Sequence, residues 1–224
     1  MKRLYHLFLI PAVLIISSCK KDEGWGKAYP IPQEVLDYFY FQPGSIWVFQ
    51  NDKTNAIDTI TVFKANKSMS NGFKGDKYEK ANSEWLSTID KYEYHYSMFT
   101  QGSAGCIKEG SKWPCYILTC TKLKTGDVFS ESFSWFYPFK QGYGGDADHS
   151  SQTSTIVMDS FIDSLQLGTK IHYKVMVVKI TNSLVANRKD TKFYWAKGVG
   201  IIKKENITDG ENWNLIYYNT IKDI

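Results

Sequence analysis

Alternation of apolar and polar residues runs through much of the chain and predicts β-strands. In residues 128–139 the aromatic residues share one parity, which only Glu131 breaks, and serines occupy the other. The aromatic residues of this parity are Phe129, Phe133, Trp135, Tyr137 and Phe139. Residues 91–98 alternate in the same way, with Tyr92, Tyr94 and Tyr96 on one parity. Because successive side chains of a strand point to opposite faces, these strands are expected to have one buried and one wet face.

Other segments add strands and one helix. Apolar or β-branched runs bounded by turn residues predict further strands; these are 45–50, 58–64, 115–122, 153–159, 170–181, 191–204 and 212–221. Residues 66–76 predict a loop, and residues 77–90 fit either a helix or an irregular strand. Residues 32–39 predict a short helix, since a proline opens the segment and Val35, Leu36 and Phe39 share one side.

The order of these elements predicts the fold class. About nine or ten strands, paired with their neighbours in sequence, predict an antiparallel all-β fold with one short N-terminal helix. The sheet is expected to be curved or to form an incomplete β-barrel. Gly198-Val199-Gly200 interrupts the segment 191–204 and predicts a bend or bulge at a corner of that sheet.

Two segments resemble a known group of proteins. GSIWVFQND (44–52), after the expected helix, and FYWAKGVGIIKKE (193–205), followed by WNLIYYN (213–219), resemble Bacteroidota lipoproteins of unknown function. The resemblance implies a β-sheet similar to the incomplete barrels of the LolA/LolB-type lipoprotein carriers. It implies no catalytic residues, and a shared fold would not by itself establish an activity.

The first nineteen residues predict export and lipidation. Lys2 and Arg3 precede an apolar run over residues 7–16, which is shorter than the roughly 20 residues needed to span a bilayer. A basic start and a short apolar core are typical of a removable signal peptide. Ile16-Ser17-Ser18-Cys19 resembles the lipobox of bacterial lipoproteins. We therefore expect residues 1–18 to be removed and Cys19 to carry two or three acyl chains, which make a durable anchor.

The residues after Cys19 bear on location and domain organisation. Lys20-Lys21-Asp22-Glu23 resembles the export signal that directs Bacteroidota lipoproteins to the outer face of the outer membrane. The alternative is a solvated start of the tether, with the protein on the periplasmic face. Residues 19–31 are expected to form the lipidated tether, and residues 32–224 a single antiparallel β domain.

Composition and charge narrow the class of partner. Aromatic residues make up 16% of the chain, which favours strands and a sizeable core. Removal of residues 1–18 takes away Lys2, Arg3 and no acidic residue, so the net charge falls from +4 to +2. Nucleic-acid binding would need a clustered basic face. We therefore expect the membrane, an apolar small molecule or an envelope protein as partner, and no nucleic acid.

Candidate site chemistry is sparse. An exported chain permits a disulfide, and Cys106 and Cys115 bracket a short segment that either a disulfide or two free thiols would fit. The glycine-rich segment 142–149 carries Asp146, Asp148 and His149, which could hold a divalent cation, but a solvated loop fits their spacing better. No cofactor is expected.

Two classes of function follow. The first is a non-enzymatic binding or structural protein, in which the aromatic rows of 91–98 and 128–139 either line an apolar ligand site or simply fill the core. The second is a surface accessory protein that contacts glycans or another envelope protein through exposed aromatic residues such as Trp113, Tyr116 or Tyr143. A hydrolase built on His149 with a neighbouring aspartate is a third, weaker hypothesis, because no local nucleophile signature is present.

Overall fold

The computed structural model describes residues 28–71, 75, 77–88, 92–100, 116–124, 130–137, 141–142, 144–149, 152–181 and 190–222 of the 224-residue chain. These residues form thirteen strands and one helix, α1 (Gln33–Phe39). The strands are β1 (Ala28–Tyr29), β2 (Ile46–Asn51), β3 (Ile57–Asn71), β4 (Lys77–Ser87), β5 (Tyr92–Thr100), β6 (Tyr116–Lys124), β7 (Ser130–Tyr137), β8 (Gly144–His149), β9 (Gln152–Leu167), β10 (Lys170–Thr181), β11 (Thr191–Ala196), β12 (Gly200–Asn206) and β13 (Asn212–Asn219).

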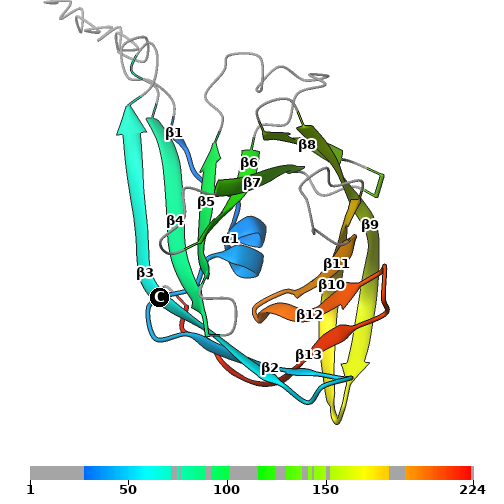
Figure 1. The fold of residues 1–224 in the computed structure, drawn as a ribbon. Helices are drawn as coiled ribbons and strands as arrows, with labels where there is room; N and C mark the ends of the chain where they lie inside the picture. The colour runs from blue at the N-terminus through cyan, green and yellow to red at the C-terminus, as the bar shows by residue number, and fades with distance from the viewer. Residues whose placement is uncertain are drawn as a thin grey trace, which may run out of the picture.

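All thirteen strands belong to one sheet. Its order is β7-β6-β5-β4-β3-β2-β13-β12-β11-β10-β9-β8, antiparallel throughout, and β1 is a short parallel addition to β4. The first and last long strands, β2 and β13, are neighbours in the middle. The two edge strands, β7 and β8, follow each other in the chain and lie in contact. Figure 1 shows the sheet curling around α1, so the predicted antiparallel all-β fold with an incomplete barrel and a short helix is confirmed.

Several element boundaries differ from the prediction. The loop predicted at 66–76 is wrong for its first part, because β3 continues to Asn71, and the ambiguous segment 77–90 is strand β4 up to Ser87. These two strands pair as far as Asn71 and Lys77, so ladder hydrogen bonds hold the outer part of the hairpin although both its faces are largely polar and exposed. A strand that is wet on both faces has no apolar alternation to reveal it.

Two further corrections concern glycine-containing segments. The solvated loop favoured for 142–149 is wrong for residues 144–149, which form strand β8 and pair with β9. Residues 191–204 form two strands rather than one, because residues 197–199 make a turn between β11 and β12. The bend or bulge expected at Gly198-Val199-Gly200 is thus a turn between two paired strands, and the register irregularity of this pair lies between Tyr194 and Trp195. These divisions account for part of the excess over nine or ten strands.

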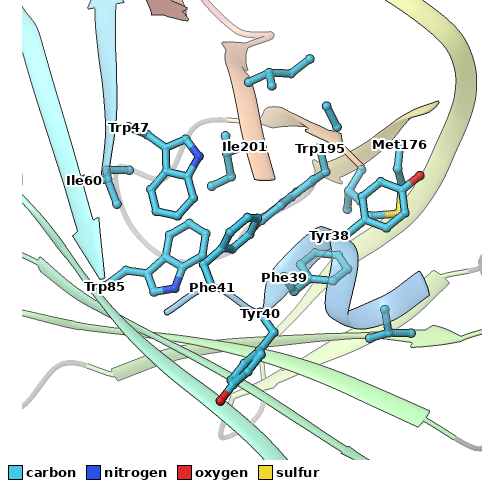
Figure 2. Packing of buried hydrophobic residues seen from close by; sticks show 14 of the residues in the cluster. Tyr38, Phe39, Tyr40, Phe41, Trp47, Ile60, Trp85, Met176, Trp195 and Ile201 are labelled. Atoms are coloured by element: carbon cyan, nitrogen blue, oxygen red, sulfur yellow. The ribbon is translucent and has the colours of Figure 1, made fainter. Parts of the chain in front are cut away.

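The core lies on the concave side of the sheet, around α1. Trp47 of β2 stacks on Trp85 of β4, with ring centroids 4.4 Å apart and an interplanar angle of 11° (Figure 2). Phe41, just after α1, meets the Trp47 ring edge-on at 4.9 Å. Phe39, the last residue of α1, lies 4.7 Å from the Trp195 ring of β11. Aromatic burial of this size provides much of the favourable free energy of folding.

The C-terminal segment fixes α1 in this position. The Lys222 Nζ donates hydrogen bonds to the carbonyl oxygens of Leu36, Asp37 and Tyr40 at 3.2, 2.9 and 3.1 Å. It also lies 3.6 Å from the centre of the Phe41 ring. α1 has no basic residue in its own last turn. Lys222 therefore supplies the cation that the carbonyl end of a helix favours, from the far end of the chain.

Candidate ligand-binding face of the sheet

The concave face of β4 is buried against α1. Ala81 and Ser83 have no exposed surface, and Trp85 is also buried. The Trp85 Nε1 donates a hydrogen bond to the Ser83 Oγ at 2.9 Å, and that hydroxyl in turn donates to the carbonyl oxygen of Phe39 at 3.5 Å. Both polar groups are thus satisfied, and Ala81 and the Trp85 ring make the rest of this stretch of β4 apolar.

Strand register aligns two of the predicted aromatic rows with this face. Ser83 of β4 pairs with Tyr96 of β5, which pairs with Cys120 of β6, which pairs with Phe133 of β7. Residues directly opposite each other on neighbouring strands belong to the same face of a sheet. Tyr96 and Phe133 therefore occupy positions of the concave face, continuous with β4.

The flanking rows extend this alignment. One runs from Ala81 through Met98 and Leu118 to Trp135. Tyr137 occupies the next concave position of β7, opposite Tyr116. The predicted aromatic residues that lie in the described parts of β5 and β7 thus fall on one side of the sheet by backbone register.

The row of Trp85 carries charge. Trp85 pairs with Tyr94, which pairs with Lys122, which pairs with Glu131. Glu131 was the residue that broke the aromatic alternation, and its register partner is a lysine of opposite charge. Opposite charges at directly opposed positions stabilise a strand pair, whereas like charges there destabilise it. Tyr92 pairs with Lys124 at the end of the same strands.

A polar cluster on the inner side of the sheet was missed by sequence reasoning. Asp58 of β3 is buried and accepts hydrogen bonds from the Ser87 hydroxyl at 2.7 Å and from the Lys204 ammonium at 3.2 Å. Lys204 also lies 4.7 Å from the centre of the Phe49 ring. The sequence did contain a sign that Asp58 is buried, because Asp58 lies two residues before the apolar Ile60 and therefore on the same face of the strand. A buried carboxylate needs such partners.

His172 is the buried histidine among the described side chains. It lies on β10 with its ring 6.1 Å from that of Tyr218, and 4% of its surface is exposed. Burial lowers the pKa of His172, and the nearby Lys170 lowers it further. The imidazole is therefore neutral near pH 7.

The predicted cation ligands lie in β8, not in a loop. Asp146 and Asp148 share one parity of this strand and His149 has the other, so in a regular strand they belong to opposite faces. Among the residues whose surroundings the structure describes, no group of three or more His, Cys, Asp or Glu residues could hold a metal ion.

The remaining predicted site residues fall outside the described part of the chain. They are Cys19, Cys106, Cys115, Phe129 and Phe139, together with Trp113 and Tyr143. Lipidation of Cys19 and a bridge between Cys106 and Cys115 stay predictions.

Comparisons with known proteins add no relative. No protein-family model, curated protein or solved structure matches this chain. Within the described ranges, no helix has the length and apolar character needed to cross a membrane.

Proposed function

We propose that this protein is an exported lipoprotein, held to the outer membrane through acylated Cys19, that binds an apolar ligand on the concave face of its sheet without catalysing a reaction. Cell-surface display follows from Lys20-Lys21-Asp22-Glu23, with the periplasmic face as the alternative. The anchor is supported by the basic start, the short apolar run and the lipobox-like Ile16-Ser17-Ser18-Cys19.

The observation that carries the binding proposal is the strand register between β4 and β7. It continues the buried apolar face of β4 into concave-face positions held by Tyr96, Phe133 and Trp135. Binding sites for small apolar molecules are concave and mostly apolar, with few polar groups. The part of the concave face next to α1 is filled by its own aromatic residues. The ligand is therefore assigned to the β5–β7 part.

Native mass spectrometry tests the binding proposal. The chain from residue 20 is expressed in the periplasm and desalted gently. We expect a co-purifying mass in the lipid range that is lost from Trp135→Glu, because a charge at a concave position opposes apolar contact. Ser134→Glu is the matched control, since it places the same charge on the other face of β7. Circular dichroism establishes that both variants fold.

The outcomes separate the functions. An adduct that both variants retain, or that both lose while folded, contradicts a ligand on the concave face. A clean apo mass for the wild-type chain contradicts ligand binding and favours a surface accessory protein. That second candidate is supported by two exposed aromatic residues, Tyr173 (65% exposed) and Tyr217 (52% exposed), which glycans or an envelope protein could contact.

The anchor has its own measurement. The mass of the membrane-extracted protein should exceed that of the chain from residue 19 by a diacylglyceryl group, with or without a further N-acyl chain. Cys19→Ala should lack this lipid mass and keep residues 1–18. Protease treatment of intact cells then separates the two locations, because only a surface-displayed chain is cleaved.

A further inference from the structure

The outer end of the β3–β4 hairpin projects beyond the core. This end, residues 66–71 of β3 and 77–82 of β4, is called the arm here. Most of its described side chains are exposed, and Ala81 is the buried exception. Figure 1 shows β3 and β4 as long strands with β1 lying beside their outer end. Apart from Ala81, the arm therefore offers exposed faces, although β1 and β5 pair with its β4 edge.

The arm is basic. Lys67, Lys77 and Lys80 are exposed. Lys67 pairs with Ala81 and so shares a face with Lys77, whereas Lys80 lies on the opposite face. Its one acidic residue, Glu79, accepts a hydrogen bond from the backbone N–H of Ile31 at 2.7 Å. The net charge of the arm is thus +2. Nearer the core, Lys64 forms an ion pair with Glu84 at 2.8 Å.

The chain enters the sheet at the arm. Ala28 pairs with Lys77, and Tyr29 with Tyr78, so β1 is fixed to the first two residues of β4. Eight residues, 20–27, lie between Cys19 and Ala28, and the nine residue-to-residue steps span about 30 Å when the chain is fully extended. An acylated Cys19 therefore holds the arm within that distance of the membrane surface.

We propose that the arm docks on the anionic lipid headgroups of the membrane that holds the anchor. This inference rests on the proposed lipid anchoring. Lysines close to an anionic surface are attracted to it, and the attraction decays within a Debye length of about 10 Å. Met69, 46% exposed beside Glu79 on the arm, adds an apolar side chain at the same place. The contact would orient the domain, with the β9–β10 turn directed away from the membrane.

Vesicle sedimentation tests the arm without the anchor. The chain from residue 20 keeps every contact described here, since those contacts lie within residues 28–222. We expect it to bind vesicles of phosphatidylglycerol and phosphatidylethanolamine at low ionic strength, and not vesicles of phosphatidylcholine. Replacing Lys67, Lys77 and Lys80 by Gln should weaken binding on the order of fivefold for each lysine, about a hundredfold in all.

A matched variant removes the same charge elsewhere. Lys53, in the turn after β2, and Lys170 and Lys174, in β10, are exposed away from the arm, and their replacement by Gln should leave most of the binding intact. Equal losses in the two triple variants, or no binding of the wild-type chain to anionic vesicles, would overturn the proposal. Neither result bears on whether Cys19 is acylated. Conversely, a chain that binds through the arm but carries no acyl mass refutes the anchor and leaves the arm as a membrane contact.

Discussion

Among the glycines whose surroundings the structure describes, Gly200 leaves the least room for a side chain. Its φ is +91°, and an added Cβ would lie 3.1 Å from the Phe41 ring and 3.3 Å from the Trp47 ring. The Trp47 indole is itself fixed, because its Nε1 donates a 2.6 Å hydrogen bond to the carbonyl oxygen of Val199. Neither ring can retreat without disturbing the stacked pair of Trp47 and Trp85.

Replacement of Gly200 by Ala should therefore destabilise the protein. We expect a loss of about 2–4 kcal/mol in the free energy of unfolding, from backbone strain at positive φ together with overpacking. Gly210 is the control, because its φ is +65° and an added Cβ meets nothing within 4 Å. Gly210→Ala should cost only the strain, about 1 kcal/mol. Urea unfolding followed by tryptophan fluorescence measures both, and equal losses would show that the contacts with the rings are unimportant.

Lys222 gives stability a dependence on pH. Burial lowers the pKa of its ammonium to about 8 in the folded protein, although the charge of Asp37 opposes the shift. The corresponding pKa in the unfolded chain is 10.5. Between these values the unfolded chain binds the proton and the folded chain does not. The free energy of unfolding should therefore rise with pH above about 8.

The effect is measurable before other groups interfere. Tyr38 has a pKa raised to about 12 by burial and by nearby Glu34 and Asp37, so ionisation of its unfolded form opposes the trend only above pH about 10. Between pH 8 and 9.5 we expect a gain of about 2 kcal/mol. Lys222→Met, which cannot titrate, should show a flatter profile in the same urea titrations. A wild-type profile parallel to that of Lys222→Met would contradict the lowered pKa.

At the scale of elements, alternation predicted the strands that have one buried face and missed those that do not. β2, with its buried Trp47 and Phe49, and β7, with its aromatic row, were found from the sequence. The outer part of β3 and the strand β8 were not, because their residues lack apolar alternation and are held by ladder hydrogen bonds to β4 and β9. Pairing energy of this kind depends on the partner strand, which a local pattern does not contain.

Alternation within each strand also predicted part of the candidate binding face. It did not predict how the strands align with one another. Parity within β5 and β7 was enough to group Tyr94 and Tyr96, or Phe133 and Trp135, on one face each. These two faces continue the buried face of β4 because of the register between strands. Alternation within a single strand does not predict that register. The ion pair of Asp58 with Lys204 joins residues 146 positions apart. No spacing rule would have brought those two residues together.

At the scale of the molecule, the sheet is closed in its middle by the two ends of the chain. β13 pairs with β2 on one side and with β12 on the other, so it joins the half formed by β2–β7 to the half formed by β8–β12. The same C-terminal region brings Lys222 to α1, and Leu215 to the core. The pairing of β2 with β13 joins strands that are far apart in sequence. It therefore closes a long loop and carries a large loop-closure entropy cost.

Truncation after Gly210 should therefore split the fold. It removes β13 and Lys222, which leaves the facing edges of β2 and β12 without a partner and α1 without its cation. We expect loss of the single cooperative unfolding transition and of the near-ultraviolet circular dichroism that reports the packed tryptophans, with far-ultraviolet signal partly retained. Truncation after Lys222 is the control, since every contact described here survives it, and it should unfold like the intact chain. Retention of one sharp transition after loss of β13 would mean that the two halves are held together by α1 and the β7–β8 edge rather than by the chain ends.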